Sequence, residues 1–179
     1  MTEALNTTTT PGICNVMRAV SIGVVGLVLS ITSASARDAR DEIDFVTRAS
    51  IGNLVATAES RLALDRTTSP EVRAFASQLV QAHAAAEAAL QAAAAGSGAA
   101  VSTTPDADHQ ASMTALQGKS GRDFDEAYVA DQAEIHSNAL TLYADYMLLG
   151  DNVKLEALAI KMIPITQAQF KRAQDLAKN

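Results

Sequence analysis

Two histidines, His83 and His136, are the residues of this sequence best suited to chemistry. Each falls at helical spacing on an otherwise apolar stripe, so each is expected to face the interior of a helical protein. Neutral imidazole is the commonest side-chain ligand for transition metals, and two imidazoles with carboxylates form a site for Fe, Mn or Zn. Glu87, four residues after His83, and Glu59 are the candidate carboxylates. One interpretation is therefore a single Fe, Mn, Zn or Cu ion held between His83 and His136.

Two glutamines, Gln132 and Gln169, also stand on apolar stripes. A buried polar group without a partner costs about 1–3 kcal/mol, so these side chains must bond to each other, to the backbone, to water or to a metal. The leading interpretation of these positions is a water-filled cluster of hydrogen bonds, or exposure at the edges of the helices. No Glu-x-x-His motif occurs, and di-iron bundles use two of them, so a dinuclear centre is not predicted.

The sequence offers no machinery for covalent catalysis. It has no Gly-x-Ser-x-Gly motif and no glycine-rich phosphate loop, and its sole cysteine is Cys14. The acidic residues Asp123 and Asp125 begin a predicted helix, where they stabilise its positive end. His109 falls near a loop, where we expect it to be solvated and without a role. We therefore predict no catalytic residues, and no cofactor other than the metal ion of the alternative interpretation.

Helical periodicity predicts four long helices, with no competing strand pattern. They span about residues 38–65, 70–95 and 120–149, and from 151 to the end, with a short helix over 109–117. Ser69 with Pro70, a capping box at Ser120, and Asp151 are the predicted starts, and Pro164 predicts a bend. Short connections force antiparallel neighbours, and residues 96–120 can cross over. The predicted fold is all-α, a ferritin-like antiparallel four-helix bundle with a short extra helix in the crossover between helices two and three.

The first 36 residues resemble a secretory signal. Met17-Arg18 precedes the apolar run 19–31, and Ala34-Ser35-Ala36 fits a cleavage site. We predict a signal peptide over residues 1–36, a single domain over 37–179, and Met17 as the true start. The run is shorter than the roughly 20 residues of a membrane span, although an uncleaved anchor is the alternative. The expected location is the periplasm or another part of the bacterial envelope.

The formal net charge is −6, and charges of both signs are scattered without a basic block. Nucleic acid and anionic lipid are therefore poor candidates as partners. No segment after Ala36 is apolar enough to span a membrane. The alanine-rich helix faces leave a third interpretation open, an assembly module that forms a weak homo-oligomer.

Several spaced motifs of the chain resemble the bacterial domain-of-unknown-function 4142 family over about residues 43–177. They are Phe45-Val46-x-x-Ala49, Phe75-Ala76-x-x-Leu79-Val80-x-x-His83, Ser120-Gly121-x-x-Phe124-Asp125-x-x-Tyr128, Gln132-x-x-x-His136 and Ile163-Pro164. The resemblance implies an exported, ferritin-like four-helix protein, a kind often labelled a membrane or outer-membrane protein. It implies the fold more strongly than the biochemistry.

The family pattern also implies a set of polar positions. His83 and His136 match its histidines in helices two and three. Ala56 stands where the pattern has a Glu, Ala82 where it has an Asp, and Gln169 where it has a last His. The resemblance therefore implies either a lost metal site or a weak mononuclear one in this chain.

Overall fold

The computed structural model describes the backbone of residues 22–178 and the side chains of residues 41–178. The described part is all-helical and contains no strand, as the sequence predicts. Its helices are α1 (Ile22–Arg66), α2 (Pro70–Ala94), α3 (Ala107–Gln117), α4 (Gly121–Leu149) and α5 (Val153–Leu176).

The chain divides into two compact units, residues 1–36 and residues 37–179. The boundary between the two units coincides with the predicted cleavage site after Ala36. The predicted start at Met17, the first part of the predicted signal peptide and Cys14 lie outside the described residues. The signal peptide and its removal therefore stay a prediction.

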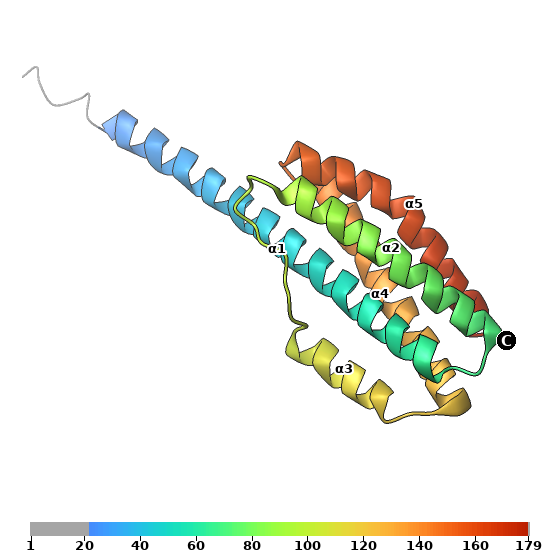
Figure 1. The fold of residues 1–179 in the computed structure, drawn as a ribbon. Helices are drawn as coiled ribbons and strands as arrows, with labels where there is room; N and C mark the ends of the chain where they lie inside the picture. Colours follow the sequence, from blue (N-terminus) through green and yellow to red (C-terminus); the bar gives the residue numbers. More distant parts are fainter. Residues whose placement is uncertain (1–21, 179) are drawn as a thin grey trace, which may run out of the picture. The chain divides into compact units, whose positions relative to one another are not determined.

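Within residues 37–179, four long helices lie side by side: the second part of α1, α2, α4 and α5 (Figure 1). The short connections at 67–69 and 150–152 make α1 antiparallel to α2 and α4 antiparallel to α5. The segment 95–120 returns along the length of these helices, with α3 on their outside, so α2 and α4 run in the same direction (Figure 1).

The caps of the helices follow the sequence prediction at one start and depart from it at two. The Ser69 hydroxyl accepts from the Val72 N–H at 3.2 Å, with proline at the first helical position, as predicted. Asn152, rather than the predicted Asp151, caps α5. The predicted capping box of Ser120 is wrong, because its side chain makes no cap hydrogen bond. Gly121, the first residue of α4, has a φ of 57°, in the left-handed region that glycine adopts readily.

The interior of unit 37–179 contains two hydrophobic clusters with polar residues between them. One cluster joins Phe45 of α1 to Leu90, Tyr143 and Leu155, and the other surrounds Phe124. We call the buried polar residues that fall between the clusters along their helices the polar layer. Its members are Asn53, Glu59, Ser60, His83, Gln132, His136 and Thr166.

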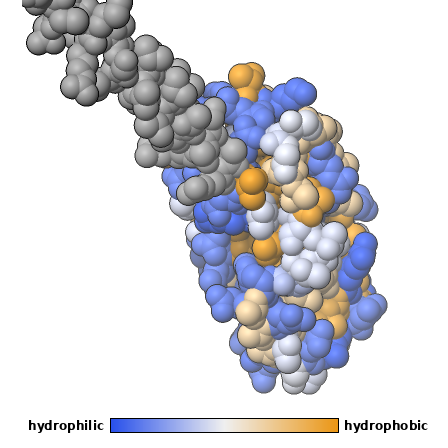
Figure 2. All heavy atoms as spheres, turned by 90° about the vertical axis from the view of Figure 1, so that its left-hand side faces the viewer, coloured by the Kyte–Doolittle hydropathy of each residue, from blue (hydrophilic) through white to orange (hydrophobic). Residues whose placement is uncertain are grey.

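On the face that Figure 2 presents, hydrophilic residues dominate and hydrophobic ones are scattered among them. The large hydrophobic side chains with substantial exposure include Leu148, Leu149 and Val153, near the turn between α4 and α5. Within the described residues, no helix combines the length and the hydropathy that crossing a bilayer requires.

The buried hydrogen bond between Ser60 and Tyr128 makes a stability prediction, since its oxygens lie 2.9 Å apart. Ser60→Ala or Tyr128→Phe alone should lower the free energy of unfolding by about 1–3 kcal/mol, because each leaves a buried hydroxyl unpaired. The double variant should lose less than the sum of the two. Urea unfolding of the four proteins measures this coupling, and strictly additive losses would contradict it.

Candidate metal centre

The two predicted ligands meet in the polar layer. His83 of α2 is 8% exposed and His136 of α4 is 1% exposed, so both histidines are buried as the sequence predicts. Their Nε2 atoms lie 3.3 Å apart, and their ring centroids lie 5.3 Å apart with 53° between the ring planes. The two imidazoles therefore point their outer nitrogens at each other.

The inner nitrogen of each imidazole faces a hydrogen-bond acceptor. His136 Nδ1 lies 2.5 Å from the backbone carbonyl oxygen of Gln132, which can only accept, so this nitrogen must carry a proton. His83 Nδ1 lies 3.0 Å from Asn53 Oδ1. The orientation of the Asn53 amide is fixed because its Nδ2 donates to Glu87 Oε2 at 3.2 Å. His83 Nδ1 must therefore donate as well.

The consequence is that two nitrogen lone pairs face each other when both imidazoles are neutral. Such a contact is favourable only with a cation between the two nitrogens, either a shared proton or a metal ion. Burial, and then the charge of His136, lower the pKa of His83 to about 3. Burial also lowers the pKa of His136, although its hydrogen bond to the Gln132 carbonyl oxygen and its hydrogen bond with the Gln169 side chain oppose the shift. A shared proton is thus disfavoured at neutral pH.

The spacing of the imidazoles fits a tetrahedral metal ion. Two nitrogens at about 2.0–2.1 Å from a tetrahedral zinc ion lie about 3.3–3.4 Å apart, with their ring centroids about 5.1–5.3 Å apart. Both values match those of His83 and His136. Among the described residues, however, no group of three or more His, Cys, Asp or Glu side chains is arranged to hold a metal. The residues therefore fit a mononuclear site with two protein ligands and do not fit a dinuclear centre.

The two candidate carboxylates accept hydrogen bonds from amide side chains. Glu87 accepts from Asn53 and from Gln91 Nε2 at 3.3 Å, so it supports His83 through the asparagine. Glu59 accepts from Gln132 Nε2 at 2.7 Å. Metal-binding histidines commonly donate their second nitrogen to an acceptor that fixes the ring, and Asn53 and the Gln132 carbonyl are placed for this role.

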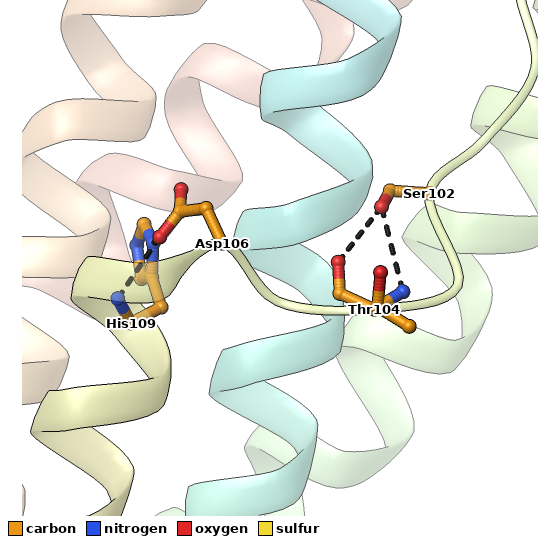
Figure 3. A network of polar contacts seen from close by, with 4 residues as sticks. All are labelled: Ser102, Thr104, Asp106 and His109. Carbon is orange, nitrogen blue, oxygen red and sulfur yellow. Dashed lines mark hydrogen bonds and ion pairs between the residues drawn. The ribbon is translucent and has the colours of Figure 1, made fainter.

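The histidine pair opens onto a cavity of about 360 Å³. Asn53, Thr166, Asp106 and His109 also line this cavity. Asp106 caps α3 by accepting from the His109 N–H at 2.9 Å, and its carboxylate also lies 2.7 Å from His109 Nδ1 (Figure 3). His109, which we expected to be solvated near a loop, lies in the first turn of α3, and its side chain is 35% exposed.

Gln132 is buried, as the sequence predicts. Gln169, which the sequence also placed on an apolar stripe, is half-buried on α5. Sequence reasoning missed Asn53, which is 5% exposed. A seven-residue spacing could have found it, because Val46, Asn53 and Ser60 of α1 are all buried, as is Thr67 directly after the helix. Such a repeat marks one continuous face of a helix.

The fold and the site define an all-α protein with a buried polar layer and a histidine pair at its centre. The chain matches the model of a family described as a domain of unknown function, DUF4142, over residues 29–176, and it belongs to that family. The resemblance drawn from the sequence motifs is thereby confirmed. No curated protein and no solved structure matches the chain.

The neutral state of the histidine pair makes a pH prediction for the metal-free protein. In the unfolded chain His83 binds a proton below about pH 6.5, whereas the folded chain keeps it neutral down to about pH 3. The unfolded state therefore binds more protons in this interval, and the free energy of unfolding should fall as the pH is lowered through it.

Replacing His83 by glutamine should make this fall shallower, because the variant has one fewer such proton to bind. Urea unfolding at intervals from pH 7 to pH 4 compares the two proteins, and Glu59, whose shift has the opposite sign, is present in both. Equal slopes would contradict the prediction. So would imidazole nitrogen NMR that places the His83 proton on Nε2.

Proposed function

We propose that the chain is an exported, ferritin-like four-helix protein that binds one divalent transition-metal ion between His83 and His136. The observation that carries the proposal is the pair of buried Nε2 atoms 3.3 Å apart, each on a ring whose Nδ1 proton is already held by an acceptor. A metal ion removes the repulsion between the two lone pairs without charging either imidazole.

The arrangement of the helices supports the ferritin-like assignment. Ferritin-like bundles have one long crossover connection and place their metal ligands on facing helices. Here the segment 95–120 is the long connection, and the two histidines come from α2 and α4 on either side of it. The missing Glu-x-x-His motifs distinguish this chain from the di-iron members of that class.

The roles of the residues follow from their contacts. His83 and His136 would be the ligands, while Asn53 and the Gln132 carbonyl orient them and keep their Nε2 lone pairs free. A bound ion would supply Lewis-acid or redox chemistry at the cavity. With two protein ligands, the remaining coordination positions face the cavity of about 360 Å³. Such an open site suits exchangeable binding of metal ions rather than permanent storage.

Equilibrium dialysis of residues 37–179 against Mn(II), Fe(II), Zn(II) and Cu(II) in turn tests the proposal. About one ion per chain is expected, with affinity rising from Mn through Fe to Cu and with Zn below Cu. The double variant His83→Ala, His136→Ala should lose the bound ion. His109→Ala, which changes a histidine elsewhere on the same cavity, should retain it.

A variant that should bind the metal ion more tightly provides a second test of the same proposal. The Gln169 side chain interacts with His136, and it stands where the family pattern has a histidine. Gln169→His should therefore add a third imidazole and tighten binding at least tenfold. Metal content that is equal in the wild type and the double variant would overturn the proposal, and so would two ions per chain.

The export part of the proposal rests on the apolar run 19–31 and the cleavage signature Ala34-Ser35-Ala36. Expression of the full sequence in a bacterium, followed by intact-mass measurement of the periplasmic fraction, should give a chain that begins at Arg37. An Ala34→Leu, Ala36→Leu variant should remain uncleaved, because the small residues of the cleavage site are gone. A full-length mass in the wild type, confined to the membrane fraction, would identify an uncleaved anchor instead.

A further inference from the structure

A second cavity, of about 270 Å³, lies beside the one at the histidine pair and shares His109, Ile135 and Asn138 with it. Its other lining residues are Glu59 of α1, Asp108 and Ser112 of α3, and Asp131 and Glu134 of α4. Four carboxylates from three helices therefore converge, and none of the described lining residues is a lysine or an arginine.

Glu59 is the unusual member of this group because it is 1% exposed. Its Oε2 atom accepts from Gln132 Nε2 at 2.7 Å. Its Oε1 atom is buried and has no hydrogen-bond partner among the described residues, and the same holds for Gln132 Oε1. A buried carboxylate that lacks a donor on one oxygen is costly, so a ligand that brings a donor to this oxygen would offset that cost.

The carboxylates that line the cavity favour the binding of a positively charged group. Burial, and then the negative charge of Asp131, raise the pKa of Glu59 to about 7. Burial and the charge of Glu134 raise the pKa of Asp131, while a 3.4 Å hydrogen bond from Ser112 and the charge of Lys119 oppose the shift. The carboxylates thus destabilise one another's charged forms, which a bound cation would relieve.

We propose that this cavity binds the ammonium group of a small primary amine, with Glu59 Oε1 as its deepest acceptor and the Asp131 carboxylate and Ser112 hydroxyl beside it. The proposal is independent of metal binding, since neither His83 nor His136 lines this cavity.

An organic ammonium fits the cavity better than a directly coordinated metal ion does. Among the described residues no three His, Cys, Asp or Glu side chains approach closely enough to hold a metal. An ammonium group instead offers three N–H donors, each to an acceptor at about 2.7–2.9 Å, so it tolerates a wider spacing of carboxylates. Ile135 gives the alkyl chain an apolar wall, and the exposed Asp108 and Glu134 would meet a second ammonium on a diamine.

Calorimetric titration of the metal-free protein with ethylammonium, 1,4-diaminobutane, tetramethylammonium and Mg²⁺ tests the proposal at pH 8, where Glu59 is ionised. The diamine should bind most tightly and ethylammonium more weakly. Tetramethylammonium has no N–H donor and should not bind, and Mg²⁺ should show only weak screening of surface charge. Binding of the diamine should weaken as the pH falls below about 7, because Glu59 takes up a proton in competition with the amine.

Matched variants locate the site. Glu59→Gln keeps the shape of the side chain and should weaken both amines at least tenfold. Glu134→Gln should weaken the diamine alone, and Asp65→Asn, which removes an exposed carboxylate outside the cavity lining, should change nothing. The double variant His83→Ala, His136→Ala should bind the diamine as the wild type does, which separates this result from the outcome of the metal experiment.

Three results would overturn the proposal: equal amine affinity in the wild type and Glu59→Gln, equal affinity for tetramethylammonium and ethylammonium, or tighter binding of Mg²⁺ than of either amine. Unfolding curves of Glu59→Gln provide the check on folding. If that variant is unfolded, carboxyl-carbon NMR of wild-type Glu59 replaces it. A signal that titrates at the same pH with and without the diamine would then be the contrary result.

Discussion

The interior of this protein depends on pairing the buried polar groups of the polar layer, which lies between two hydrophobic clusters. Each cluster can exclude water by packing alone, but the polar residues between them must find partners on other helices. Asn53 bridges Glu87 and His83, Gln132 reaches Glu59, and Ser60 pairs with Tyr128. These bonds join α1 to α2 and α4, so they fix the relative rotation of the helices as well as their distance.

The same bonds leave specific atoms without a donor, and those atoms define the two candidate sites. His83 and His136 donate their Nδ1 protons to Asn53 and to the Gln132 carbonyl, which leaves their Nε2 atoms facing each other. The Gln132 amide donates to Glu59 Oε2, while Glu59 Oε1 has no hydrogen-bond partner among the described residues. In a low dielectric, unpaired acceptors attract cations strongly.

Both cavities thus contain acceptor atoms without a donor, but they differ in the kind of cation that these acceptors can bind. Neutral imidazole nitrogens at 3.3 Å favour a small ion bound by direct coordination. Spread carboxylates favour a ligand that satisfies them by hydrogen bonds. Ile135, Asn138 and His109 form the partition between the cavities, so the first turns of α3 border both.

The sequence by itself determined the all-helical class, the family, and the inward direction of His83, Gln132 and His136. These features follow from residue periodicity and motif spacing, which are local properties of a helix. The start of α5 and the cap of α4 were predicted less well, because several residues near each turn can cap a helix and residue type alone does not select one of them.

Tertiary structure alone decided which polar atoms pair. The sequence offered Glu87 and Glu59 as ligands, yet one supports Asn53 and the other faces a second cavity. Asn53 and His83 are 30 positions apart in the chain, and their contact depends on how far α1 is shifted along α2. Periodicity fixes the face of each helix, whereas the axial shift and rotation between helices come from packing, which no single helix encodes.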